Sequence, residues 1–107
     1  MSNLDQALDK FLDHVNNLLK DYISRNNYTF LIERNAHIAK SAPGAKYMRL
    51  VHMEDGKARS IYCFVDLETG DLLKGSWKSP VKNGIRGNVF NISTFQNFDH
   101  HGPKYLK

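Results

Sequence analysis

The segment Gly70–Asn88, GDLLKGSWKSPVKNGIRGN, gathers positive charge around the only tryptophan of the chain, and no acid follows Asp71 within it. Lysine and arginine side chains neutralise phosphates and release counterions, and an indole stacks on a base for about 1 to 3 kcal/mol. Glycines let a backbone approach a ligand closely. The segment therefore predicts a site for single-stranded DNA or RNA, made by Lys74, Trp77, Lys78, Lys82, Arg86 and Asn88.

The spacing of the four cations indicates which element carries them. They recur every four residues, but two glycines and a proline interrupt any continuous helix. A strand followed by a loop places the first two on one face, and the last two join them from the loop, so that all four meet at one groove. Trp77 reaches that groove if the strand ends just before it. The alternative interpretation makes Trp77 a core residue and the lysines a solvated rim.

Charge is unevenly distributed along the 107 residues, whose formal net charge is +4. Residues 2–27 hold four acids and three bases, whereas residues 72–98 hold four bases and no acid. Such segregation favours a polyanionic partner. The alternative is that a small protein carries this charge only to stay soluble.

Length and composition predict a single domain over residues 1–107 with a substantial core, because 41% of the residues are hydrophobic. No stretch approaches the roughly 18 to 20 apolar residues of a membrane span, and the N-terminal residues lack the apolar run of a signal peptide. Cys63 is the only cysteine, which excludes an intramolecular disulfide and fits a reducing compartment. We therefore expect a cytoplasmic protein without a membrane partner.

Residue types that serve in catalysis and metal binding do not occur at the spacing of a known catalytic or metal site. The histidines His14, His37, His52, His100 and His101 lack the spacing of metal ligands. Cys63 and His52 can face each other across a hairpin as a nucleophile and its base. However, Cys63 belongs to the most apolar stretch, where a cysteine usually acts as a small hydrophobe. Asp66, Glu68 and Asp71 surround a turn, as acids commonly do. We predict no enzyme activity, no metal and no cofactor.

An amphipathic helix is predicted over residues 3–25. Its apolar residues recur at spacings of three and four, and Lys20 and Arg25 lie near its end, where the helix dipole favours cations. One interpretation packs the apolar stripe on a sheet of the same chain. The other makes the stripe a dimerisation arm that gives a homodimer. The residues of that arm are Leu4, Leu8, Phe11, Val15, Leu18 and Tyr22.

Residues 28–92 are predicted to be rich in β-structure. Tyr28 to Ile32 is aromatic and β-branched, which is typical of a strand, and Ser41–Gly44 predicts a loop. Residues 46–53 and 58–67 flank Asp55-Gly56, a favoured centre of a tight hairpin turn. Residues 61–65 are apolar throughout. They indicate a central strand that the helix covers on one face and another element or a partner covers on the other.

A second turn is predicted at Glu68–Asp71, followed by a strand from Leu72 to Trp77. From Ser79 the pattern weakens. Residues 81–85 predict at most one helical turn, residues 89–92 predict a further strand, and residues 93–107 predict an irregular tail unless its aromatic side chains dock it. The predicted fold class is α+β, with one N-terminal amphipathic helix packed on an antiparallel β-meander of three to five strands.

Three stretches carry a resemblance to other proteins: CFVDLETGD at 63–71, SWKSPVK at 76–82 and RGN at 86–88. Together they resemble small proteins of uncharacterised function found in tailed bacteriophages. The resemblance covers residues 61–90 and implies no functional residue. It implies a context, a phage protein in the host bacterial cytoplasm. Small basic phage proteins usually act there in replication, transcription takeover, packaging or the blocking of host defences.

These observations predict a small accessory protein that binds nucleic acid through a basic, tryptophan-containing strand and loop. The alternative is a protein-interaction module, either a virion component or an inhibitor of a host protein, because Trp and Arg also anchor protein interfaces. The first hypothesis predicts an affinity that falls steeply with salt. The second hypothesis predicts a protein partner, and nucleic acid should not affect the binding of that partner.

Overall fold

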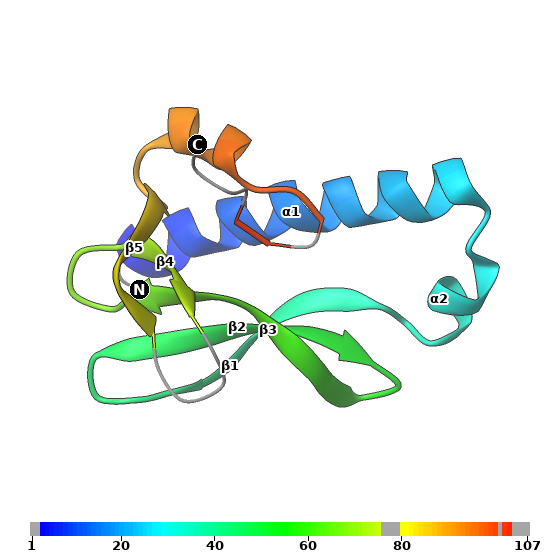
Figure 1. Ribbon diagram of the computed structural model, residues 1–107, viewed down its shortest axis with the longest axis horizontal. Coiled ribbons are helices and arrows are strands. Elements are labelled where there is room, and N and C mark those ends of the chain that lie inside the picture. The colour runs from blue at the N-terminus through cyan, green and yellow to red at the C-terminus, as the bar shows by residue number, and fades with distance from the viewer. Residues whose placement is uncertain (1–2, 76–79, 101, 104–107) are drawn as a thin grey trace.

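One long helix and five antiparallel strands dominate the structure, a computed structural model that describes residues 3–75, 80–100, 102 and 103, except the side chains of residues 81–83. Helix α1 (Asn3–Asn26) runs along the sheet, and α2 (Thr29–Glu33) follows it (Figure 1). The later elements are β1 (His37–Pro43), β2 (Tyr47–Glu54), β3 (Lys57–Asp66), β4 (Asp71–Gly75), β5 (Pro80–Asn88) and the 3-10 helix η1 (Ile92–Asn97). The strands pair in sequence order, which confirms the predicted α+β class and antiparallel meander.

Helix α1 packs its apolar stripe on the sheet of its own chain. Its buried residues are Leu8, Phe11, Leu12, Val15, Leu19 and Ile23, which share one core with strand residues. Three residues predicted for dimerisation, Leu8, Phe11 and Val15, are at most 1% exposed, so a second copy cannot reach them while the core is closed. The packing interpretation is therefore correct for these three. Neither α1 nor another helix in the described part of the chain has the length and apolar character of a membrane-spanning helix.

Two polar contacts fix α1 to the edge strand β1. The Asn16 side chain donates to the Ile38 carbonyl at 2.9 Å and accepts from the Ile38 backbone N–H at 2.7 Å. The Lys40 ammonium lies 3.0 Å from the Asp9 carboxylate. The two hydrogen bonds of the Asn16 amide satisfy the backbone N–H and carbonyl of Ile38, on a strand that has only one strand neighbour. They also set the register between the helix and the sheet.

The β2–β3 hairpin forms where Asp55-Gly56 predicts it. Asp55 and Gly56 both have positive φ, 54° and 74°, and Glu54 pairs with Lys57, as the tight turns favoured in hairpins require. The predicted turn after β3 is also present. There the Asp66 carboxylate, 8% exposed, accepts from two backbone N–H groups of the turn. Asp66 therefore closes the turn from within the protein.

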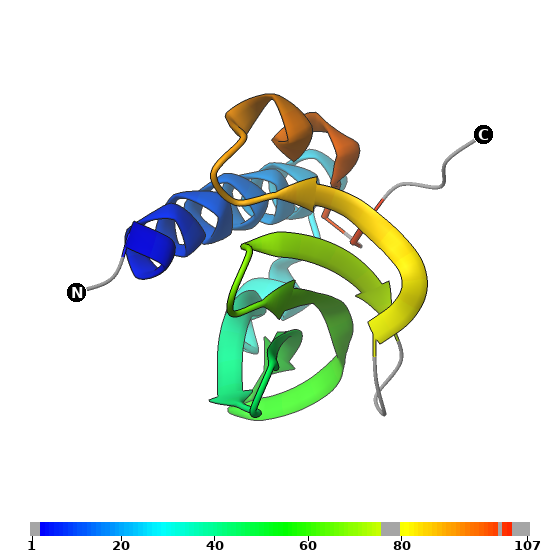
Figure 2. The ribbon, with the colours of Figure 1, turned by 90° about the vertical axis from the view of Figure 1, so that its left-hand side faces the viewer.

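Strand β3 is the middle strand of the sheet, and both of its faces are covered, as predicted. Cys63 and Val65 pack in the main core with α1. Phe64 lies on the other face and is only 3% exposed. The sheet is strongly curled (Figure 2), and Val51 and Leu73 are buried like Phe64 outside the main core. On the face of β3 that carries Phe64, other residues of the curled sheet therefore provide part of the burial.

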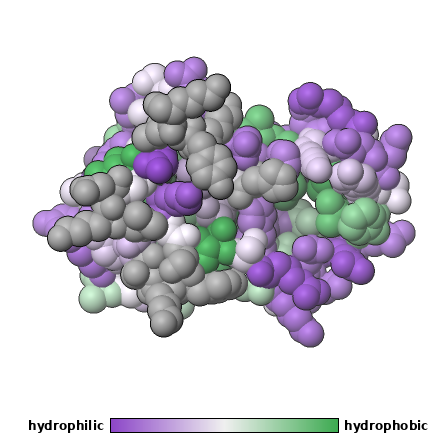
Figure 3. Space-filling view, in the orientation of Figure 1, coloured by the Kyte–Doolittle hydropathy of each residue, from purple (hydrophilic) through white to green (hydrophobic). Residues whose placement is uncertain are grey.

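Helix α2 covers residues 29–33 in place of the strand predicted at residues 28–32. Asn27 ends α1 with a φ of 55°, and α2 follows at once. Tyr28 and Leu31, three residues apart, pack against the core, whereas Phe30 and Ile32 are 50% and 64% exposed. A strand would place Tyr28, Phe30 and Ile32 on one face, but the core offers contacts at helical spacing. Figure 3 shows the hydrophobic surface that results over α2.

Two segments predicted to be irregular are strands. Ser41–Pro43, predicted as part of a loop, ends β1 with a register shift after Lys40. Pro80–Asn88 forms β5, in place of the single helical turn predicted within it. Both strands lie at the edges of the sheet, where a proline costs no ladder hydrogen bond. The pairing of β5 with β4 also shifts register twice, which accommodates its glycines.

The chain turns at residues 89–92 instead of forming the strand that was predicted there, and η1 follows. Phe95 and Phe98 are 5% and 2% exposed. Their rings pack edge-on against Phe11, with centroids 5.2 Å and 4.9 Å away. The segment predicted as an irregular tail thus begins with an ordered helix that docks on α1 on the side away from β1–β3 (Figures 1 and 2).

Candidate functional site

The residues predicted to bind nucleic acid belong to one hairpin, named here the basic hairpin, residues 71–88. Its strands pair through Asp71 with Asn88, Leu72 with Gly87, Leu73 with Ile85, and Gly75 with Pro80. Lys74 therefore lies on β4, while Lys82 and Arg86 lie on β5, an edge strand. Trp77, Lys78 and the side chain of Lys82 lie outside the described residues. The strand pairing thus places Lys74, Lys82 and Arg86 on two adjacent strands. The sequence had instead predicted the last two on a loop.

Arg86 is the extra residue of a β-bulge. Its neighbours Ile85 and Gly87 pair with consecutive residues of β4, so Arg86 itself has no partner residue opposite it. Its side chain is half-buried, and one guanidinium nitrogen lies 3.4 Å from the Ile85 carbonyl oxygen. The Nε donor is buried and has no hydrogen-bond partner in the described part of the chain. A buried donor without a hydrogen-bond partner is costly for folding.

Replacing Arg86 with methionine is expected to leave folding stability unchanged or to raise it. A buried unsatisfied donor costs roughly 1–3 kcal/mol, and methionine keeps the apolar stem. A gain of about 1 kcal/mol raises the Tm of a domain of this size by roughly 4 °C. Thermal unfolding measures the change. Arg25→Met is the matched control, because Arg25 is exposed and paired with Asp21. A lower Tm for Arg86→Met than for the control contradicts the interpretation that the Arg86 Nε donor is buried without a partner.

Asn88 has a structural role at the base of the basic hairpin. Its side-chain nitrogen donates to the Thr69 carbonyl and to the Asp71 carboxylate, both at 3.0 Å. Its side-chain oxygen accepts from the Phe90 backbone N–H at 2.8 Å. Both amide hydrogens are thus used inside the protein, so Asn88 closes the turn rather than offering donors to a ligand.

Two further cations, Lys46 just before β2 and Arg49 on β2, join this region through the sheet, and sequence reasoning did not identify them. The cross-strand row Arg49, Phe64, Leu73, Ile85 runs from β2 to β5. The Arg49 guanidinium lies 5.6 Å from the Phe64 ring centroid, and the Lys46 ammonium lies 5.3 Å from that of Tyr47. These pairs are cation–π contacts. Only the strand register relates them to the basic hairpin, since 20 or more residues separate them from it in sequence.

Cys63 is a core thiol. It pairs with Leu50 and is completely buried, whereas His52 pairs with Ser60. Burial raises the pKa of the Cys63 thiol well above its ordinary value, which makes the thiol a poor nucleophile. The His52–Cys63 pairing considered from sequence is therefore absent. The described residues contain no cluster of three or more side chains that could hold a metal ion.

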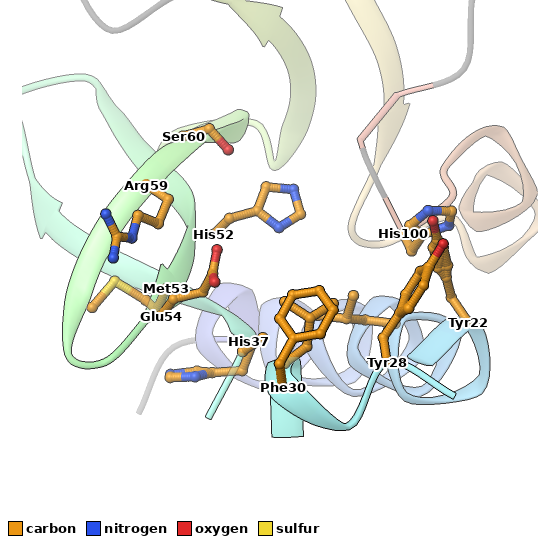
Figure 4. Close-up of a pocket in the computed structure, with 13 residues that line it drawn as sticks. Tyr22, Tyr28, Phe30, His37, His52, Met53, Glu54, Arg59, Ser60 and His100 are labelled. Carbon is orange, nitrogen blue, oxygen red and sulfur yellow. The ribbon is translucent and has the colours of Figure 1, made fainter. Parts of the chain in front are cut away.

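A second surface feature, named here the aromatic pocket, lies between α1, α2, the β2–β3 hairpin and His100. Its volume is about 280 Å³. Aromatic and polar side chains that line it include Tyr22, Tyr28, Phe30, His52, Ser60 and His100. Figure 4 shows Tyr22, Tyr28 and His100 on one side, His52 and Ser60 on the other, and Phe30 between them. A hydrogen bond with Tyr28 raises the pKa of the Tyr22 hydroxyl.

Sequence reasoning missed this pocket because its walls come from six separate segments. The strand predicted at residues 28–32 would have placed Tyr28 and Phe30 on one face of a sheet. The helical turn instead presents them to the β2–β3 hairpin. The one signal in the sequence was the presence of three aromatic residues, Tyr22, Tyr28 and Phe30, close together in the chain.

Neither the curated proteins nor the solved structures contain a match to this chain. A family model described as "Family of unknown function (DUF7717)" matches residues 2–106, a range that includes every element from α1 to η1. The chain therefore belongs to this family of unknown function.

Proposed function

We propose that this protein binds single-stranded nucleic acid, DNA or RNA, through the basic hairpin. The observation that carries the proposal is the position of the charge: residues 72–88 hold four bases and no acid, and they form a hairpin at the sheet edge. An edge strand offers backbone N–H groups as well as its cations. Phosphates would therefore meet two kinds of donor along residues 72–88, which hold no acid.

Aromatic and cationic side chains at the start of β2 support the same function. Tyr47 is half-buried, and Lys46 lies over its ring. Arg49 lies over the ring of Phe64. Single-stranded nucleic acids bind where bases stack on aromatic or guanidinium planes next to a positively charged track. The β2 residues can supply the stacking plane, and the basic hairpin can supply the track.

A protein-interaction module is the second candidate, and exposed hydrophobic side chains favour it. Among the described residues, those that are 50% or more exposed are Phe30, Ile32, Ile85, Phe90 and Ile92. Exposed apolar side chains that gather into patches commonly mark interfaces. The resemblance to tailed-phage proteins would make the partner a host or virion protein.

The double charge reversal Lys78→Glu with Lys82→Glu tests the proposed function. Fluorescence anisotropy of labelled single-stranded DNA, single-stranded RNA and duplex DNA is measured at low and near-physiological salt. We expect the wild type to prefer a single strand. Each lost phosphate contact reduces the slope of log K against log salt by about 0.7 for single strands, so the double variant should lose roughly 1.4.

The matched control is Lys10→Glu with Lys57→Glu, which changes net charge equally at two exposed lysines outside the basic hairpin. The control is expected to keep most of the salt slope. Equal losses in both double variants mean that net charge alone attracts nucleic acid, which contradicts a defined site. No binding of any nucleic acid to the wild type at low salt overturns the proposal and favours the protein-interaction module.

A further inference from the structure

The aromatic pocket already contains one stacked heterocycle, the imidazole of His100. This ring lies against Tyr22 with the centroids 3.6 Å apart and the planes 15° from parallel. Tyr28 stands edge-on to Tyr22 at 5.6 Å, and Phe30 is tilted against Tyr28 at 5.7 Å. This side of the pocket therefore accommodates a flat nitrogen heterocycle by stacking.

The opposite side of the pocket carries hydrogen-bonding groups. His52 and Ser60 are direct partners across β2 and β3, and the His52 ring extends into the space above Phe30 in the view of Figure 4. An imidazole has a donor and an acceptor nitrogen, and a hydroxyl both donates and accepts. The edges of nucleobases combine donors and acceptors in the same way.

Size selects a single ring. Among the described residues that line the pocket, Arg59 and Glu54 carry opposite formal charges. Glu54 also lies 3.7 Å from Arg34. The volume of about 280 Å³ is just below the range of roughly 300–1,000 Å³ that holds drug-sized ligands. One base fits, and an attached sugar would extend to the surface.

We propose that the aromatic pocket binds one nucleobase, stacked against Tyr28 and Phe30 and hydrogen-bonded at its edge by His52 and Ser60. The base belongs either to a free nucleoside or to an unpaired strand, since both present the same ring. No described residue of the basic hairpin lines the pocket. The pocket can therefore bind a base whether or not the basic hairpin binds phosphates.

Backbone amide shifts of ¹⁵N-labelled protein, titrated with adenosine, uridine and ribose 5-phosphate, test the pocket. The two nucleosides are expected to shift the amides around Phe30, His52 and Ser60, whereas ribose 5-phosphate, which lacks a base, leaves them unchanged. Phe30→Ala should weaken nucleoside binding about fivefold or more, the loss of at least one stacking contact. Phe90→Ala is the matched control, because Phe90 is 53% exposed, compared with 50% for Phe30, and does not line the pocket.

A single-stranded oligonucleotide of about eight nucleotides separates the two sources of the base. If Phe30→Ala weakens its binding as well, the pocket takes a base from a strand. If Phe30→Ala weakens only nucleoside binding, the ligand is free. Nucleoside binding without any oligonucleotide binding supports the pocket and overturns the function proposed for the basic hairpin. Pocket amides that respond neither to nucleosides nor to the oligonucleotide overturn the pocket, even if the charge reversals abolish strand binding.

Discussion

Phe11→Ala is expected to lower the free energy of unfolding by about 3–5 kcal/mol, the cost of a large cavity in a core. Phe11 is fully buried on α1. Its ring meets Tyr62 of β3 at 6.3 Å and also meets Phe95 and Phe98 near the C-terminus. One side chain thus joins the helix, the central strand and the C-terminal segment. Because small domains are stable by only about 5–15 kcal/mol, the variant should be close to unfolding at 37 °C.

Urea unfolding followed by circular dichroism measures this change, with Phe90→Ala as the control. The control removes the same ring from a side chain that is 53% exposed, so its free energy of unfolding should change by less than about 1 kcal/mol. Similar losses in both variants would show that Phe11 does not hold the three elements together. A selective loss of protection from hydrogen exchange in η1 would show that Phe95 and Phe98 undock first.

Gly87→Ala is expected to destabilise the protein by about 1–3 kcal/mol through overpacking. A Cβ at this position would lie 2.8 Å from Thr94 Oγ1 and 2.9 Å from Phe98 Cε1. Neither neighbour can move freely. The Thr94 hydroxyl bonds both the backbone N–H and the carbonyl of Asn88, and Phe98 is 2% exposed. The glycine is needed because η1 crosses β5 closely at this point.

Thermal unfolding of Gly87→Ala measures the effect, and Gly56→Asn is the control. Gly56 has a φ of 74°, and a Cβ at this position would meet no described atom within 4 Å. Asparagine tolerates this backbone conformation. The control should therefore keep its Tm within a few degrees, whereas Gly87→Ala should lose roughly 4 to 12 °C. If the two Tm values fall equally, the cost comes from replacing glycine as such and not from the contact with η1.

Local sequence signals determined those elements whose conformation depends mainly on the preferences of their own residues. The apolar period of three and four specified α1 over almost its whole length. Asp55-Gly56 specified the β2–β3 hairpin, because both residues accept positive φ at little cost. The unbroken apolar run at 61–65 specified a strand that is covered on both faces. The uneven charge of residues 72–98 was likewise visible without coordinates.

Tertiary packing decided the segments whose local signals are weak or mixed. Tyr28–Ile32 has strand-forming residues, but the core contacts only Tyr28 and Leu31. Residues 29–33 are therefore helical, and the segment forms a wall of the aromatic pocket. Residues 80–88 contain proline and glycine, yet they form a strand because β4 has a free edge that needs a hydrogen-bonding partner. Helix η1 exists where Phe95 and Phe98 fill the space beside Phe11. In each case burial and hydrogen bonding over long sequence distances outweighed local preference, whose differences amount to only about 1 kcal/mol per residue.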